Sequence, residues 1–205
     1  MLGSPTRVES HTVTLGDGWP KSGSPLDSFA SSFSEDGRIA RDDLFDLAED
    51  CVAHGGWTRL LIASYAWGTG RTGYGPFRCN RILREPHIEE SPCEGVRLAN
   101  SESPVNAYYY LNNRTKGHVP GLGPAFFTKF LYFAGRNSPR PHALILDQVL
   151  VGAIRTISTN PRLLAGASWR TTIYAFYLAY VDHLAQRVGV PTDEIECRIF
   201  RTLIN

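Results

Sequence analysis

The sequence predicts an all-α protein, and three observations support this prediction. Apolar residues recur at helical spacing in a series of segments along the chain. Glycine and proline separate these segments at the points where helices are expected to begin and end. No segment shows the convincing alternation of apolar and polar residues that is typical of a strand. The 205 residues can bury a core as one domain or as two small, closely packed lobes.

Two regions of different composition divide the chain. Residues 1–37 are rich in glycine, proline, serine and aspartate, and they predict an irregular arm with one short helix at about 26–33. Residues 38–205 hold the periodic apolar segments and are predicted to form a single helical domain.

The first half of this domain is predicted to hold two strong helices and a glycine-rich loop. An acidic surface helix is expected at 41–53 and a mostly apolar, buried helix at 57–67. The loop at 68–76 contains four glycines, which let the backbone approach a partner closely. One or two helical turns follow at 77–84, and the polar, proline-containing segment 85–104 is expected to connect two lobes.

The second half is predicted to be a succession of helices. Proline at its first position favours a helix at 124–134, because proline lacks only an N–H group that would have no partner there. Further helices are expected at 105–113, 146–158, 168–188 and 191–203.

Charge is distributed unevenly, although the formal net charge is only +1. Residues 35–50 carry seven acids, whereas residues 51–84 carry five arginines and no acid. Between residues 103 and 181 there are eight lysines and arginines, and Asp147 is the single carboxylate. Such a basic stretch favours a polyanionic partner such as DNA, because lysine and arginine displace counterions from phosphates.

Cysteine usage and hydropathy exclude several classes of protein. The four cysteines are scattered without a C-x-x-C pair, so we expect no zinc or iron–sulfur site, no metal held by side chains and no cofactor. The N-terminus lacks an apolar signal region and no window is long enough to span a membrane. We therefore expect a cytoplasmic protein, associated with the nucleoid and not with a membrane.

The segment 113–123 between two predicted helices is a candidate phosphate-binding hairpin. Gly121 and Gly123 permit a tight turn, and the helix that follows begins with exposed N–H groups that can hold a phosphate. Lys116 and His118 lie beside this turn in the sequence. The alternative is an ordinary connection between helices, which also favours proline and glycine.

Lys129 and Asp147 are the candidate catalytic residues. Lys129 lies among aromatic residues in a basic stretch, and both features favour the neutral amine, which can attack a sugar C1′ and form a Schiff base. The alternative is a lysine that extends from an apolar helix to solvent. Asp147, at the start of a helix, is expected to stay ionised and to stabilise positive charge developing on a deoxyribose. The alternative is a helix N-cap, and both roles can coexist.

A flipped base needs flat side chains and a polar group that reads its edge. Most aromatic residues are expected in the core, and Trp67 and Trp169 are the first candidates for such a pocket, with Gln148 and Tyr177 beside them. Three arginines, Arg71, Arg78 and Arg81, are expected to follow backbone phosphates, although solvation of the surface explains each of them equally well.

These residues resemble the helix-hairpin-helix DNA glycosylases, specifically the branch of compact bacterial 8-oxoguanine DNA glycosylase (OGG)-like proteins. The resemblance is clearest over residues 104–158, and it rests on 119–123, on the helix with Lys129 and on 143–147. Weaker similarity covers residues 65–70 and 195–200.

The resemblance implies a two-lobed helical fold with the active site in the cleft between the lobes and a helix-hairpin-helix at about 104–135. It also implies base flipping, an essential aspartate, and a lysine that displaces the base and promotes strand cleavage. Carbonyl groups of the hairpin often hold a monovalent cation in this superfamily. One departure is clear: the usual lysine lies two residues after the second hairpin glycine, where this chain has Ala125, and Lys129 lies one helical turn later.

The predicted function is a DNA glycosylase with apurinic-site lyase activity, acting in base excision repair as a monomer on damaged, double-stranded DNA. Lys129 would attack C1′, Asp147 would stabilise the transition state, and the base would be a damaged or modified purine such as 8-oxoguanine. If only Asp147 acts, the enzyme would be a monofunctional glycosylase that uses water. The alternative from another class is a non-catalytic module that binds nucleic acid or a modified purine nucleotide, in a bacterial anti-phage defence system. A third hypothesis is a helical scaffold whose basic face binds an acidic protein.

Overall fold

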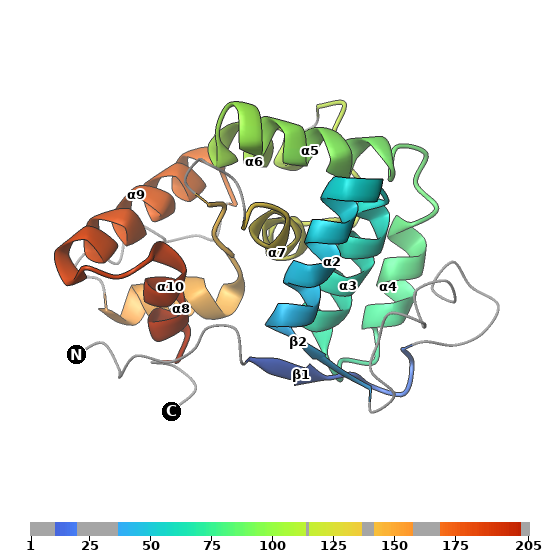
Figure 1. The fold of residues 1–205 in the computed structure, drawn as a ribbon, viewed down its shortest axis with the longest axis horizontal. Helices are drawn as coiled ribbons and strands as arrows, with labels where there is room; N and C mark the ends of the chain where they lie inside the picture. The colour runs from blue at the N-terminus through green and yellow to red at the C-terminus, as the bar shows by residue number, and fades with distance from the viewer. Residues whose placement is uncertain (1–10, 20–36, 114, 137–141, 158–168, 202–205) are drawn as a thin grey trace.

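The structure is a computed structural model that describes residues 11–19, 37–113, 115–136, 142–157 and 169–201. The described part of the chain is helical apart from one two-stranded sheet, which confirms the predicted all-α class (Figure 1). Its helices are α2 (Arg41–His54), α3 (Trp57–Thr69), α4 (Gly75–Ile82), α5 (Glu90–Ser101), α6 (Pro104–Asn112), α7 (Pro124–Ala134), α8 (Gln148–Ile157), α9 (Thr171–Val188) and α10 (Thr192–Arg201).

Eight of these helices were predicted, and their bounds differ from the predictions by less than one helical turn. The helix α7 is central in Figure 1, where α2 and α3 lie on one side of it and α8 to α10 on the other. Its aromatic density explains this position, because Phe127, Phe130 and Phe133 are fully buried. None of the described helices combines the length and the hydropathy needed to cross a membrane.

A small antiparallel sheet joins the N-terminal arm to the helical body. The strand β1 (Thr12–Thr14) pairs with β2 (Arg38–Ala40). The expectation of no strand was wrong, because three-residue strands are too short to show alternation. Leu15 and Trp19 are buried, so this part of the predicted irregular arm belongs to the core. The short helix expected at about 26–33 lies outside the described residues.

The segment 85–104 is not a mere connection, because it contains the helix α5, which packs on α6. Its inward face is built from small residues at helical spacing, including Ser91, Gly95 and Ala99. A prediction based on large apolar residues missed this pattern. Pro92 is tolerated because it lies in the first turn of the helix, where its missing N–H breaks no hydrogen bond.

Candidate active site

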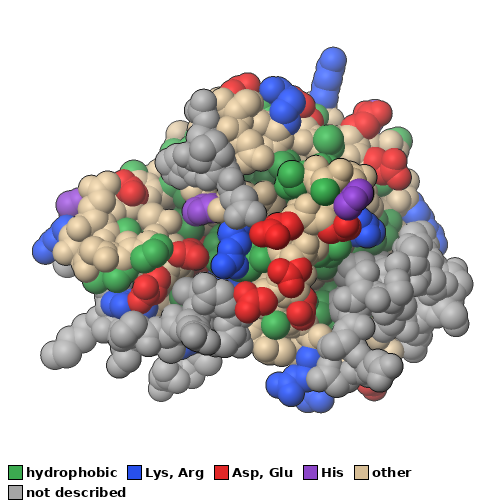
Figure 2. All heavy atoms as spheres, viewed as in Figure 1, with side chains coloured by type: hydrophobic (Ala, Val, Ile, Leu, Met, Phe, Trp, Pro, Cys, Tyr) green, Lys and Arg blue, Asp and Glu red, His purple; other side chains and the backbone are tan. Residues whose placement is uncertain are grey.

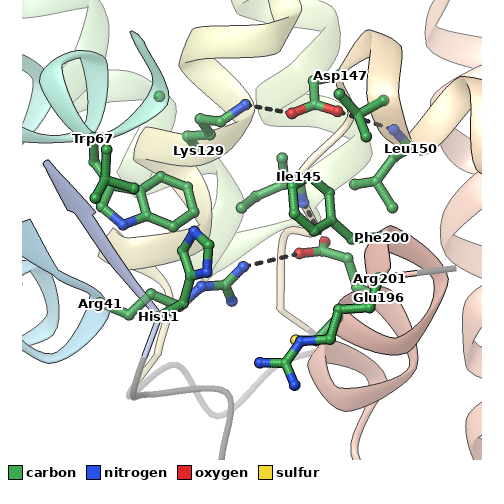
Figure 3. Close-up of a pocket in the computed structure, with 14 residues that line it drawn as sticks. His11, Arg41, Trp67, Lys129, Ile145, Asp147, Leu150, Glu196, Phe200 and Arg201 are labelled. Atoms are coloured by element: carbon green, nitrogen blue, oxygen red, sulfur yellow. Dashed lines mark hydrogen bonds and ion pairs between the residues drawn. The ribbon is translucent and has the colours of Figure 1, made fainter. Parts of the chain in front are cut away.

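A cavity of about 520 Å³ lies where α3 and α7 face α8 and α10 (Figure 3). The described residues that line it are His11, Val13, Arg41, Trp67, Gly68, Lys129, Ile145, Asp147, Val149, Leu150, Glu196, Cys197, Phe200 and Arg201. Both predicted catalytic residues are in this set. The cavity has the size of small-molecule sites in proteins, which enclose about 300–1,000 Å³.

Lys129 extends from α7 into this cavity and is only 6% exposed. Its Nζ donates to Asp147 Oδ2 at 2.7 Å and to the carbonyl of Ala125 at 3.0 Å. The ammonium group therefore reaches back to Ala125, in the first turn of α7. The expectation that Lys129 is surrounded by positive charge was wrong, because the residue it pairs with is a carboxylate.

The helix α3 leaves room for the lysine stem at Gly68. A Cβ atom at this position would lie 2.8 Å from Lys129 Cδ and 3.2 Å from Cε. Real Cβ atoms essentially never lie within 3.0 Å of another heavy atom of this kind, so any larger residue at position 68 would displace the lysine stem. The approach of α3 to α7 at Gly68 thus fixes the path by which Lys129 reaches Asp147.

Asp147 lies directly before α8, and its carboxylate accepts hydrogen bonds from two groups. Its Oδ1 accepts a hydrogen bond from the backbone N–H of Leu150 at 3.0 Å, which is the geometry of a helix N-cap. Its Oδ2 faces Lys129, so the two predicted roles coexist in one side chain (Figure 3). Burial raises the pKa of Asp147, but the charge and hydrogen bond of Lys129 and the N–H groups of α8 outweigh it. The net pKa is lowered, which keeps the carboxylate ionised.

The extended segment 143–147, which carries Asp147, is held by side chains rather than by a neighbouring strand. Three helices each provide one polar side chain that binds its backbone. Tyr174 of α9 pairs with Leu144, Glu196 of α10 accepts from Ile145 N at 2.6 Å, and Thr128 of α7 accepts from Leu146 N at 3.0 Å. Because a buried N–H without a partner is costly, these side chains determine where Asp147 lies.

Opposite the lysine and aspartate, Arg41 and Glu196 form the other polar part of the cavity wall (Figure 3). Their closest atoms, Arg41 Nη2 and Glu196 Oε1, are 3.9 Å apart, which is too long for a hydrogen bond. The Glu196 Oε2 atom is occupied by Ile145 N and the hydroxyl of Tyr177. Burial raises the pKa of Glu196 to about 7, although Arg41 and the Ile145 N–H favour its ionised form.

Flat side chains complete the cavity. Trp67, from α3, and Phe200, from α10, both line it, and the His11 ring meets each of them edge-on at centroid distances of 5.3 and 6.3 Å. Burial, together with the charges of Arg41 and Arg201, lowers the pKa of His11 and favours a neutral imidazole at pH 7. The cavity therefore offers aromatic surfaces between two polar walls.

Five charged or ring-bearing residues of the lining were not predicted from the sequence: His11, Arg41, Glu196, Phe200 and Arg201. Arg41 begins a helix whose sequence indicates an acidic surface, and His11 lies in a segment without periodicity. The weak resemblance over 195–200 was the available signal for Glu196 and Phe200.

The predicted base-pocket residues are only partly brought together. Trp67 lines the cavity, whereas Trp169, Gln148 and Tyr177 do not. The carbonyl group of Trp169 accepts from two side chains of α6, Gln148 is exposed at the start of α8, and Tyr177 is buried behind Glu196. Helical spacing does not distinguish a ring that lines a cavity from one that packs behind it.

The predicted phosphate-binding hairpin lies between α6 and α7 with its polar residues outward. Lys116 and His118 are exposed, and Gly121 has a φ of +87°, a conformation that favours glycine. Gly123 is the N-cap of α7 and offers no side chain to cap it. The first N–H groups of α7 and the Lys129 ammonium group are thus at the same end of one helix.

The three predicted arginines are all exposed, with Arg71 in the glycine-rich loop and Arg78 and Arg81 on α4. None of them lines the main cavity. Within the described residues, no group of three or more His, Cys, Asp or Glu side chains is placed to hold a metal ion. A monovalent cation on hairpin carbonyls remains a prediction.

The comparison with protein families agrees with the resemblance in the sequence. Residues 6–200 match the family described as "Putative 8-oxoguanine DNA glycosylase OGG-like protein". Because the match spans nearly the whole chain, the chain belongs to this family of OGG-like proteins. Searches of curated proteins and of solved structures gave no match.

Proposed function

We propose that the protein is a DNA glycosylase with apurinic-site lyase activity that removes an oxidised purine, with 8-oxoguanine as the first substrate to test. One observation carries this proposal: Lys129 and Asp147, far apart in the sequence, meet at 2.7 Å on the wall of a cavity of about 520 Å³. Lys129, once its ammonium group has given up a proton, supplies the nucleophile, and the ionised Asp147 supplies the electrostatic stabilisation that glycosidic bond cleavage requires.

The cavity would receive the base after it leaves the DNA stack. Trp67 and Phe200 provide flat surfaces for a purine ring. Arg41 offers a donor and Glu196 an acceptor, and they lie close together without being hydrogen-bonded to each other. This pair complements a base edge that carries a carbonyl group beside an N–H group. Such an edge occurs in oxopurines and not in adenine, so the pair would favour an oxopurine.

The reaction would take place on the opposite wall. As the bond between C1′ and the purine nitrogen breaks, its electron pair leaves with the base, and a proton released by Lys129 neutralises the departing base. The Nζ atom forms the new bond to C1′, while the Asp147 carboxylate stabilises the positive charge on the sugar. The C1′–O4′ bond then breaks, O4′ takes up the proton that the secondary amine gives up, and a Schiff base forms. Loss of a C2′ proton to water drives β-elimination, which breaks the C3′–O3′ bond and releases the 3′-phosphate as the leaving group.

The surface around the cavity would hold the DNA backbone. The hairpin residues Lys116, His118, Gly121 and Gly123 surround the N-terminus of α7, where N–H groups and the helix dipole attract a phosphate. Because Lys129 reaches back to the first turn of α7, a phosphate bound there would bring a neighbouring sugar toward its amine. Arg71, Arg78 and Arg81 would add phosphate contacts.

Single-turnover base release from a duplex that contains 8-oxoguanine tests this proposal, with strand cleavage measured separately. We expect Asp147→Asn to slow base release by about 100-fold or more, in the range found for removed transition-state contacts. Lys129→Gln should abolish strand cleavage by β-elimination. The control Arg187→Gln should retain both activities, because Arg187 is exposed on α9, outside the cavity and the proposed DNA-binding residues.

Two results would count against the proposal. Unchanged base release in both cavity variants would remove the assigned roles of Lys129 and Asp147. Tight binding of DNA by the wild-type protein, with every base left in place, would favour the non-catalytic binding module.

A further inference from the structure

An exposed surface of aromatic and arginine residues lies beside the cavity, on the glycine-rich loop and α4. Tyr74 is 72% exposed and Phe77 69% exposed, which makes them the most exposed aromatic residues described. Arg78 follows Tyr74 by four positions and Arg81 follows Phe77 by four, so each aromatic ring has an arginine on the same side of the helix. We call Arg71, Tyr74, Phe77, Arg78 and Arg81 the α4 face.

The α4 face carries positive charge that the described residues leave without an ion-pair partner. The ion pairs found among the described residues include none of its three arginines. No carboxylate occurs in the sequence from residue 51 to residue 84. Asp17 lines a second cavity, of about 420 Å³, together with Arg71, and no ion pair joins these two residues in the described structure. A strand of phosphates would supply the missing negative charge.

The backbone beneath these side chains is fixed by hydrogen bonds. Thr72 N donates to the carbonyl of Thr69, Gly75 N to that of Thr72, and Arg78 N to that of Tyr74. The buried indole of Trp19 lies against Gly75, and Cys79 and Ile82 anchor the inner side of α4. The two aromatic rings are thus held outward by a supported backbone, which lowers the entropy lost when a partner binds them.

This surface and the cavity meet at the same end of α3. Gly68 lines the cavity, and Gly70, two residues later, packs against Val13, which lines it too. In Figure 1 the turn from α3 to α4 lies at the lower end of both helices, next to β1. A nucleic-acid strand with one nucleotide in the cavity would therefore run toward the α4 face.

We propose that the α4 face binds an unpaired DNA strand, with bases stacked on Tyr74 and Phe77 and phosphates paired with the arginines. Phosphate contacts alone would need only the arginines, whereas exposed aromatic rings gain from base faces that a perfect duplex keeps covered. The protein should then prefer single-stranded or locally opened DNA over a fully paired duplex. This inference rests on the proposed function in taking DNA as the partner and in placing one of its nucleotides in the cavity.

Binding of undamaged oligonucleotides tests this inference independently of excision. A labelled single strand of about 16 nucleotides and its perfect duplex are compared by fluorescence anisotropy. The test variant is Tyr74→Ala with Phe77→Ala, and Tyr74→Leu with Phe77→Leu keeps apolar volume without aromatic faces. The matched control is Tyr109→Ala with Phe176→Ala, which removes two exposed aromatic residues from α6 and α9.

We expect the wild-type protein and the control to bind the single strand more tightly than the duplex. Both α4-face variants should lose at least about tenfold in affinity for the single strand, since stacking on an aromatic side chain contributes substantially per base. Their affinity for the duplex should change little. The leucine variant gives the readout if the alanine variant does not fold.

Three results would overturn the inference: preference of the wild-type protein for the duplex, unchanged single-strand binding in both variants, or an equal loss for both DNA forms. Equally tight binding of polyglutamate would also contradict it, because that polymer has charge without bases. Excision of 8-oxoguanine, measured on the same samples, separates the two proposals. Excision without a preference for single strands would contradict only the proposed role of the α4 face. A preference for single strands without excision would contradict only the proposed glycosylase activity.

Discussion

At the scale of single residues, Lys129 and Asp147 stabilise each other in a place where neither charge would be stable alone. Their side chains are 7% and 16% exposed, and the ammonium and carboxylate groups are 2.7 Å apart. Removing one member of a buried ion pair leaves the other charge without compensation, which costs several kcal/mol. The catalytic candidates are therefore also part of the stability of the fold.

Replacement of Asp147 tests this dual role. Asp147→Ala should lower the free energy of unfolding by about 3 kcal/mol at pH 7, because it removes both the partner of Lys129 and the cap of α8. Because the folded-state pKa of Asp147 is lowered, its contribution is present above about pH 4 and is lost as the pH falls through the folded-state pKa. Urea unfolding at several pH values measures this dependence. Asp147→Asn, which keeps a capping side chain, should lose less of the free energy of unfolding. An equal loss of stability in Asp147→Ala at pH 3 and at pH 7 would show that the ionised form of Asp147 does not stabilise the fold.

For Glu196 we expect the opposite dependence of folding stability on pH. Its pKa is raised to about 7 in the folded protein from an ordinary value of 4.5, so the folded state holds a proton that the unfolded state has released between these values. Stability should therefore fall by about 3 kcal/mol as the pH rises from 4.5 to 7, and then stay level. Glu196→Gln removes this titration. A stability difference between wild type and Glu196→Gln that does not vary with pH would show that the folded-state pKa is ordinary.

At the scale of elements, the approach of α3 to α7 guides the side chain of Lys129. Gly68→Ala places a methyl group where the Lys129 stem now lies, so the stem must move. We expect base release to fall by about tenfold to 100-fold, since small displacements of catalytic groups have effects of this size. The melting temperature should change little, because alanine favours a helix and the lysine stem is flexible.

The matched control is Gly73→Ala, in the glycine-rich loop, where an added Cβ atom meets nothing within 4 Å. This variant should retain the activity of the wild type. Equal activity of Gly68→Ala and wild type would show that the position of the lysine stem is not critical.

Most elements could be predicted from the sequence, since large apolar residues at helical spacing locate α2, α3, α7 and α9. The helix α5 was missed because Gly95 and Ala99 carry too little apolar surface to give a periodic signal. Asp147 could be predicted because it is the single carboxylate in a basic stretch of the sequence. Lys129 could be predicted because it follows the hairpin. Arg41 and Glu196 could not, since each reaches the cavity through pairing of elements that lie far apart in the sequence.

At the scale of the whole molecule, charge is separated between faces despite the small net charge. Figure 2 shows acidic side chains gathered over α2, and the α4 face and the hairpin carry exposed basic residues. DNA would avoid the acidic side of α2 and approach the surfaces that surround the N-terminus of α7 and the α4 face.

The salt dependence of DNA binding follows from this separation. Each neutralised phosphate contributes about −0.9 to the slope of log K against log salt, so several arginine and lysine contacts predict a slope of about −3 or steeper. Titrations from low to moderate salt measure the slope. Substitution of Arg71 and Arg78 by glutamine should make it shallower, whereas binding that does not respond to salt would contradict a phosphate-binding surface.

Borohydride trapping shows most directly whether Lys129 is the nucleophile. The trapping is done on two duplexes, one with 8-oxoguanine and one with an abasic site. The chain has only three lysines, Lys21, Lys116 and Lys129, so the trapped residue is readily identified by mass spectrometry of the adduct. We expect a covalent adduct at Lys129 that is lost in Lys129→Gln and kept in Lys116→Gln. No adduct on either duplex, or an adduct that persists in Lys129→Gln, would contradict the assignment of Lys129 as the nucleophile.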